Sequence, residues 1–218
     1  MSVQIPLQRI QVPPGQRVLL RDVSWNEFEA ILEKLGDRRS SRVAYCDGML
    51  EIMTPLPEHE YFKETIGDAI KDMAETLELD YESYGSTTWR QQAKQAGLEA
   101  DNCFYFQNES IVRGRLDINL AQDPPPDLAL EIGVTSKSLE RFPIYARLGV
   151  PELWCYDAGM ITIYQLQDGQ YVEAEQSNIF TKLDIRALPQ LIEENRSAGR
   201  LALRRSVRAW VREQMGKE

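Results

Sequence analysis

Apolar residues recur at intervals of three and four along two early segments, which is the pattern of helices that bury one face. Ser24 and Glu27 form an S-x-x-E capping box at the start of the first segment, and Gly36 is a natural stop. The apolar stripe of this first helix consists of Phe28, Ile31, Leu32 and Leu35. A longer helix is predicted over residues 57–78, with its stripe at Phe62, Ile66, Ala69, Ile70, Met73 and Leu77.

Other segments follow the pattern of strands and turns. Two short apolar runs, residues 42–46 and 49–53, flank Asp47-Gly48, a strong hairpin signal, and a second hairpin turns at Asp168-Gly169. Strand-like segments are predicted near 80–90, 100–107, 128–134 and 150–156, with helices before Gly149 and near 187–195 and 199–215. This mixture predicts an α/β fold in which a mixed sheet is flanked by helices, and not a doubly wound parallel sheet.

One of these strands carries a carboxylate among apolar residues. Side chains alternate in a strand, so Leu128, Leu130, Ile132 and Val134 face a core, while Ala129, Glu131 and Gly133 face the other way. The two small neighbours of Glu131 leave space for an ion or a substrate.

Asp101 lies near the start of the strand-like segment Glu99–Phe106, and it can converge on Glu131 if the two strands pair. Two carboxylates that share a site repel each other, and a divalent cation such as Mg²⁺ or Mn²⁺ relieves that repulsion. Such a cation polarises a phosphoryl oxygen and activates water for hydrolysis. The spacing alone does not separate this reading from two salt-bridge partners or strand-end residues.

Composition and charge limit the class of protein. The 218 residues are 43% hydrophobic and 27% charged, as in ordinary globular proteins, and three cysteines inside apolar runs read as core residues. No apolar run is long enough to span a bilayer, and the first residues lack a signal pattern, so a cytoplasmic protein is expected. A single histidine argues against a catalytic triad, and no phosphate-binding loop or zinc cluster is present.

The net charge of −9 excludes a generally basic surface for nucleic acid, but the last residues are rich in arginine. Arg204, Arg205 and Arg208 in this tail are candidates for binding nucleic acid. A solvated amphipathic helix, or a helix that forms a dimer, explains the same pattern. The predicted organisation is an extended arm (1–22), one domain (23–195) and a basic C-terminal helix (196–218).

Five segments, in order, resemble one family. They are DGMLEIMTPLPEHE (47–60), GSTTWR (85–90), GLEADNCFYF (97–106), DPPPDLALEIGVTSKS (123–138) and IYARLGVPELWCYD (144–157). Together they are similar to the Uma-two family of restriction-endonuclease-like proteins, abundant in cyanobacteria, over about residues 22–195. The resemblance implies a PD-(D/E)XK nuclease core whose two acidic residues fall on Asp101 and Glu131.

The lysine of that nuclease pattern falls on Gly133, so it is absent from its usual position. The resemblance implies that the following helix supplies a basic residue instead, either Lys137 or Arg141. A lysine with a lowered pKa takes part in proton transfer, whereas an arginine stays charged and only stabilises developing negative charge. A solvated loop cation is the simpler interpretation of both residues.

Four further residues are candidate accessory groups. Glu51 on the first hairpin is a candidate metal ligand, and His59 and Glu60 open the long helix, where related nucleases place an accessory acid. His59 is equally interpretable as a structural residue on the inward side of that helix. Asp127 has the same strand parity as Glu131 but follows three prolines, which favours a role at the strand entry.

The function expected from these residues is a Mg²⁺-dependent (or Mn²⁺-dependent) endonuclease that hydrolyses DNA phosphodiester bonds. The alternative is an inactive module with the nuclease fold that binds nucleic acid or a protein partner, favoured by Gly133 and by the net acidity. DNA is therefore the expected partner. A homodimer is expected only by analogy with restriction enzymes.

Overall fold

The structure is a computed structural model that describes residues 10–36, 40–133 and 139–216. Its strands form a five-stranded sheet in the order β1-β3-β2-β6-β5 and a six-stranded sheet in the order β11-β10-β9-β8-β7-β4. Within the described part of the chain, β8 and β9 pair in parallel and all other neighbouring strands pair antiparallel. The predicted α/β class, with a mixed sheet flanked by helices, is confirmed. The strands are divided between two sheets.

The strands are β1 (Arg17–Leu20), β2 (Arg42–Cys46), β3 (Met49–Met53), β4 (Glu82–Ser83), β5 (Thr88–Gln91), β6 (Ala96–Glu99), β7 (Asn102–Tyr105), β8 (Leu128–Ile132), β9 (Glu152–Asp157), β10 (Met160–Gln167) and β11 (Gln170–Ala174). The α-helices are α1 (Trp25–Leu35), α2 (Pro57–Thr76), α3 (Glu109–Val112), α4 (Phe142–Leu148), α5 (Leu188–Asn195) and α6 (Arg200–Met215). Three short 3-10 helices span Gln92–Lys94, Ile185–Ala187 and Arg196–Ala198.

Local sequence signals explain several of these boundaries. The Ser24 hydroxyl accepts a hydrogen bond from the Glu27 amide while the Glu27 carboxylate accepts one from the Ser24 amide, so the predicted capping box starts α1. Asp47 and Gly48 both have positive φ, 45° and 82°, as a two-residue hairpin turn between β2 and β3 requires. The turn at Asp168-Gly169 has the same form, so both predicted hairpins are confirmed.

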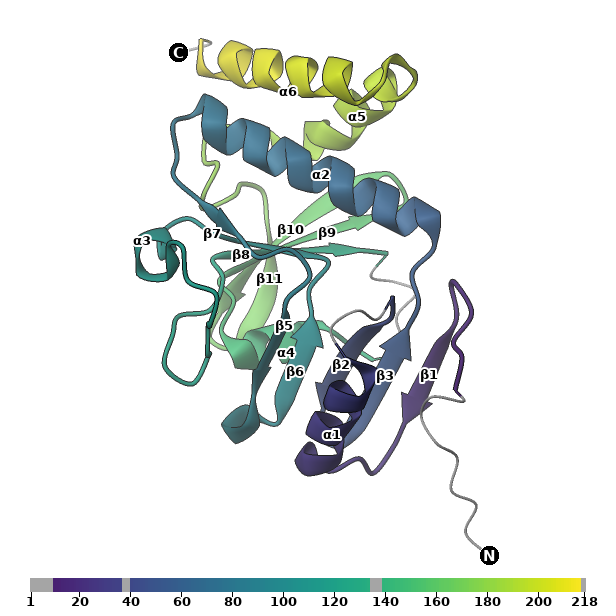
Figure 1. The fold of residues 1–218 in the computed structure, drawn as a ribbon. Coiled ribbons are helices and arrows are strands. Elements are labelled where there is room, and N and C mark those ends of the chain that lie inside the picture. Colours follow the sequence, from purple (N-terminus) through teal and green to yellow (C-terminus); the bar gives the residue numbers. More distant parts are fainter. Residues whose placement is uncertain (1–9, 37–39, 134–138, 217–218) are drawn as a thin grey trace, which may run out of the picture.

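The six-stranded sheet separates two of the three apolar clusters. On one face, α2, α5 and α6 lie over the sheet, as the upper layer of Figure 1 shows, and bury Ile70, Trp154 and Val207. On the other face, α4 and β6 bury Ala129, Cys103 and further residues. A third cluster lies between α1 and the five-stranded sheet. Alternate residues of β8 therefore belong to different cores, as the alternation predicts.

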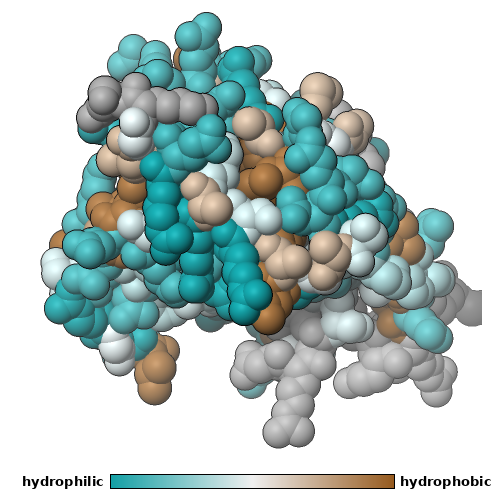
Figure 2. All heavy atoms as spheres, turned by 90° about the horizontal axis from the view of Figure 1, so that it is seen from above, coloured by the Kyte–Doolittle hydropathy of each residue, from teal (hydrophilic) through white to brown (hydrophobic). Residues whose placement is uncertain are grey.

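Helix α6 is held to α2 by charge as well as by apolar contacts. Asp72 of α2 has no exposed surface, and it accepts hydrogen bonds from Arg204 Nε at 2.8 Å and Arg208 Nε at 2.7 Å. Seen from above in Figure 2, this layer presents mainly hydrophilic side chains, with apolar side chains between them. The basic tail is therefore a helix packed on α2, and two of its arginines neutralise the charge of Asp72.

Two further sequence expectations bear on the chain as a whole. All three cysteines are buried, as expected of small core residues. None of the described helices combines the length and the apolar character needed to cross a membrane. The division into arm, domain and C-terminal helix stays a prediction, although residues 17–20 of the arm form β1 at the edge of the five-stranded sheet.

Candidate functional site

The change from one sheet to the other places Asp101 beside Glu131. Strand β6 belongs to the five-stranded sheet and β7 to the six-stranded sheet, and Asp101 lies in the bend between them. In the β7–β8 ladder Asn102 pairs with Leu130, so Asp101 lies one position further, level with Glu131. The Ile132 amide donates a hydrogen bond of 2.8 Å to Asp101 Oδ2, which fixes the carboxylate against the end of β8.

Glu131 is buried, with only 1% of its surface exposed, and a tyrosine orients it. The Tyr145 hydroxyl of α4 donates a short hydrogen bond to Glu131 Oε1. Burial raises the pKa of Tyr145 well above its ordinary value, so the phenol keeps its proton and acts as a donor. Helix α4 thus holds the carboxylate at a defined position.

His59 contacts the other carboxylate from the first turn of α2. Its Nε2 lies 3.1 Å from Asp101 Oδ2. Its Nδ1 is buried and makes no hydrogen bond among the described residues, although it lies 3.5 Å from Glu60 Oε1. Because a distance of 3.5 Å without hydrogen-bond geometry is weak, we regard the Asp101 contact as the one that orients the ring.

Arg141 and Glu51 form a buried ion pair close to these residues. Arg141 NH2 lies 3.3 Å from Glu51 Oε1, and the two side chains are 2% and 1% exposed. The Leu139 amide donates to Glu51 Oε2 at 3.2 Å. Among the described residues, Nε and NH1 of Arg141 are buried without a hydrogen-bond partner. Two guanidinium donors therefore remain for a group outside the described residues, such as water or an anionic ligand.

The remaining predicted accessory acids lie elsewhere or are already engaged. Glu60 is 38% exposed and pairs with Arg42 and Lys63 at 3.3 and 2.9 Å. Burial alone would raise the pKa of Glu60, but the hydrogen bond and charge of Lys63, together with the charges of Arg42 and His59, outweigh it and lower the pKa. Asp127, at the other end of the β7–β8 pair, accepts hydrogen bonds from the Phe106 and Asn108 amides. Asp127 is thus a strand-entry residue. The predicted Lys137 lies outside the described residues.

The backbone at Gly133 disfavours a lysine at the position where the family resemblance implies one. Strand β8 ends at Ile132, and Gly133 has φ of +66°, in the left-handed region. A side chain in this conformation costs roughly 1–2 kcal/mol, a cost that glycine avoids. A lysine is therefore disfavoured there by the turn itself.

The predicted nucleic-acid-binding arginines differ in their surroundings. Arg204 and Arg208 pair with Asp72, and Arg208 also lies 3.2 Å from Glu75. Arg205 is exposed, and no ion pair joins it to a described residue. Of these three arginines, only Arg205 has no carboxylate partner among the described residues.

Comparison with known proteins identifies the family. The sequence model of Uma2, described as "Putative restriction endonuclease", matches residues 25–203. The chain belongs to the Uma2 family. Among solved structures, one titled as a "putative nuclease belonging to DUF820" from Anabaena variabilis aligns with a TM-score of 0.48 and 11% identity, covering 78% of this chain and 90% of that one. No curated protein matches the chain.

The donor atoms of this Uma2 chain suit a hard divalent cation. Asp101 and Glu131 offer carboxylate oxygens, the ligands that Mg²⁺ and Mn²⁺ prefer. Within the described ranges, no group of three or more His, Cys, Asp or Glu side chains is placed to hold a metal ion. A cation bound here would take its other ligands from water or from a substrate phosphate, as Mg²⁺ commonly does.

Sequence reasoning missed Tyr145, which the Uma2 fold places at the centre of the site. Tyr145 follows Arg141 by four residues, so both lie on one face of the short helix α4. That spacing was visible in the sequence, although only Tyr145 lies within a segment that carries the family resemblance. Nothing in the sequence indicated that this face of α4 packs against the end of β8.

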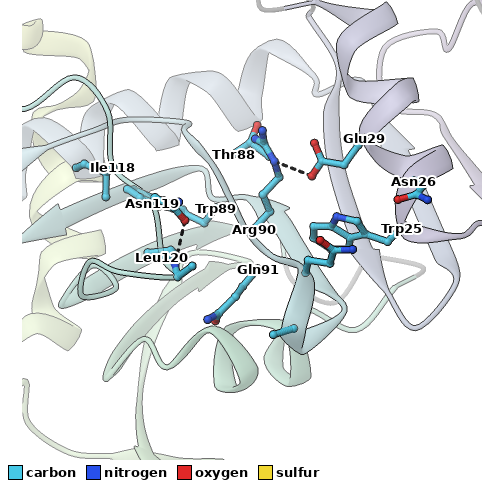
Figure 3. Close-up of a pocket in the computed structure, with 13 residues that line it drawn as sticks. Trp25, Asn26, Glu29, Thr88, Trp89, Arg90, Gln91, Ile118, Asn119 and Leu120 are labelled. Atoms are coloured by element: carbon cyan, nitrogen blue, oxygen red, sulfur yellow. Dashed lines mark hydrogen bonds and ion pairs between the residues drawn. The ribbon is translucent and has the colours of Figure 1, made fainter.

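Two pockets of the Uma2 chain differ in their relation to these carboxylates. A pocket of about 780 Å³ lies between α1, β5 and residues 118–121, where Arg90 of β5 points to Glu29 of α1 and pairs with it at 2.9 Å (Figure 3). None of the predicted site residues is among those that line it. A smaller pocket of about 420 Å³ is lined in part by His59, Ile132 and Gly133 and therefore adjoins Asp101.

Proposed function

We propose that this Uma2 protein is a Mg²⁺-dependent or Mn²⁺-dependent endonuclease that hydrolyses DNA phosphodiester bonds. The observation that carries the proposal is that two buried carboxylates, Asp101 and Glu131, lie level on neighbouring strands. Arg141, near the Tyr145 that bonds Glu131, has two buried nitrogens with no hydrogen-bond partner among the described residues. A family described as restriction endonucleases supports the nuclease class.

In this proposal Asp101 and Glu131 hold the cation, which when bound polarises the phosphate and activates a water molecule. The Ile132 amide and the Tyr145 hydroxyl keep the two carboxylates in place. The guanidinium of Arg141 donates to the phosphate oxygens as negative charge develops, and it stays charged, so it is not the base.

His59 is the candidate for proton transfer in this mechanism. Its Nε2 contacts Asp101, which fixes the ring, and its Nδ1 is the buried nitrogen without a hydrogen bond. In this proposal the oriented imidazole acts as a general acid or base. Lys137, the other basic group expected from the resemblance, remains a candidate for the same step.

The test is metal binding and DNA cleavage by wild type, Asp101→Asn and Glu131→Gln. Calorimetry with Mg²⁺ or Mn²⁺, alone and with a short duplex, measures binding, and a labelled plasmid reports cleavage. Each variant is expected to lose at least about 100-fold in metal affinity or cleavage rate. Glu152→Gln is the matched control, because Glu152 is an equally buried carboxylate (1% exposed) bonded to Ser177 and Trp154.

The second candidate function is an inactive nuclease fold that binds DNA or a protein. The absence of lysine at position 133 and the engagement of Arg141 by Glu51 favour it. Wild-type cleavage that survives in Glu131→Gln would refute the metal assignment. No cleavage and no metal binding, even with duplex present, would leave the binding module, whose DNA affinity should fall steeply with salt.

Two accompanying expectations concern the state of the protein in the cell. We propose a cytoplasmic location, and a homodimer by analogy with restriction enzymes. Sedimentation equilibrium of the purified chain tests the dimer, and a monomer at micromolar concentration would exclude it under those conditions.

A further inference from the structure

The pocket of about 420 Å³ beside Asp101 has no assigned occupant in the chemistry proposed above, although His59 lines it. His59 and Ile132 line the pocket, and both contact Asp101 Oδ2, at 3.1 Å through Nε2 and at 2.8 Å through the main-chain amide. A molecule in the pocket would therefore lie one residue away from the carboxylate proposed to hold the cation.

The inner wall of the pocket is apolar and aromatic. The rings of Phe62 and Tyr156 lie 4.5 Å apart between centroids, at an interplanar angle of 33°. Met53 and Leu56 extend this apolar surface. The volume is at the lower end of the roughly 300–1,000 Å³ found for small-molecule sites, so the pocket suits one small planar molecule and is too small for a base pair with its backbones.

Charged groups at the pocket select the kind of planar molecule. Glu58 and Asp157 line it and supply hydrogen-bond acceptors, while Arg17 from β1 supplies one cation. Two carboxylates repel a phosphate placed between them, but they accept hydrogen bonds from amino groups. Cytosine, adenine and guanine carry an exocyclic amino group, and thymine does not.

We propose that this pocket receives a single unpaired base of the DNA strand that is cleaved. The base would stack on Phe62, its amino group would donate to Glu58 or Asp157, and Arg17 would contact the neighbouring phosphate. The proposal rests on the proposed function and narrows the substrate to DNA with an extruded or unpaired amino-bearing base. Stacking on aromatic rings is a general way to hold such bases.

The test compares binding of a duplex with one central bulged cytosine, the same duplex with a bulged thymine, and the fully paired duplex. Fluorescence anisotropy is measured with wild type in EDTA and again with Ca²⁺ in place of Mg²⁺. The bulged cytosine is expected to bind about 10-fold more tightly than the paired duplex, and the bulged thymine less tightly than the cytosine.

Phe62→Leu removes the ring but keeps an apolar side chain, and it should abolish the preference for the bulge. Phe106→Leu is the matched control, because Phe106 is also a partly buried aromatic residue that packs on the same apolar cluster. It follows β7, whereas Asp101 and the pocket lie at the start of that strand. Equal binding of bulged and paired duplex under both conditions, or a preference that persists in Phe62→Leu, would overturn the proposal.

Failure of the pocket proposal can be distinguished from failure of the nuclease proposal. Mg²⁺-dependent cleavage that needs Glu131, without any preference for the bulge, would refute the pocket assignment alone. A bulge preference that depends on Phe62, without any cleavage, would refute the nuclease and leave the pocket.

Discussion

The buried ion pair between Glu51 and Arg141 offers a direct test of how the site is held. Glu51→Gln keeps the shape of the side chain and removes its charge. The two side chains are 1% and 2% exposed, so solvent cannot replace the lost carboxylate. Two nitrogens of Arg141 already lack a hydrogen-bond partner among the described residues, and the variant would remove the charge of the carboxylate that the buried guanidinium contacts.

The expected cost follows from these burials. Removing one partner of a buried pair costs about 3–5 kcal/mol. The lower end applies here, because the Gln amide oxygen still accepts one hydrogen bond from Arg141 or from the Leu139 amide. A loss of about 3 kcal/mol corresponds to a decrease in Tm of roughly 6–12 °C for a chain of this length.

Urea unfolding followed by tryptophan fluorescence measures the free energy of unfolding of both proteins. Glu29→Gln is the control, because its pair with Arg90 spans a similar 2.9 Å but is 38% and 45% exposed, and such pairs contribute at most about 1 kcal/mol. The double variant Glu51→Met with Arg141→Met should recover most of the stability, since apolar replacement of both partners removes the unpaired charge. A Glu51→Gln protein within about 1 kcal/mol of wild type would refute this reasoning.

Three further predictions test other contacts. Tyr145→Phe removes the hydrogen bond to buried Glu131 and should lower the metal affinity measured by calorimetry about 10–100-fold. An unchanged affinity would show that Tyr145 does not position the carboxylate. Replacing both Arg204 and Arg208 by Ala should lower the free energy of unfolding in urea by about 2–4 kcal/mol, because Asp72 is fully buried although its partners are 36% and 40% exposed. The control, Arg205→Ala, should stay within about 0.5 kcal/mol of wild type. Equal losses of stability in the two proteins would contradict the role of Asp72. Burial raises the pKa of Glu152 above its ordinary 4.5, so its contribution to stability is complete below pH 4.5 and is lost as the pH rises through the higher folded-state value. The stability of Glu152→Gln relative to wild type should therefore increase with pH across that window, and a constant difference would exclude the effect.

Much of the local structure was readable from short-range signals. The capping box at Ser24 and the turns at Asp47-Gly48 and Asp168-Gly169 form as predicted, because each depends on residues adjacent in sequence. The turn at Ala158-Gly159 also has two positive φ angles, 47° and 82°, yet alanine gave no signal for it. Pairing of β9 with β10 imposes that conformation on the alanine.

The segment around Asp101 shows where local reasoning ends. Residues 99–106 have the pattern of one strand, but the chain bends at Asp101 and passes from one sheet to the other. In the sequence, the consecutive strands β6 and β7 look like one long strand because their composition is similar. Their separation depends on pairing with β2 and β8, which lie far away along the chain. The bend is also what turns the Asp101 carboxylate toward the Ile132 amide and His59.

By itself the sequence determined the mixed α/β class and the alternation that sends Leu130 and Glu131 to opposite faces of β8. These features depend on periodicity and on residue type, which are properties of the chain alone. Only the tertiary structure decided that Tyr145 holds Glu131, that Glu51 engages Arg141 and that Asp72 takes up Arg204 and Arg208. Those contacts join residues 14, 90, 132 and 136 positions apart, and such pairs form only where packing removes both groups from water and leaves each charge to find its partner.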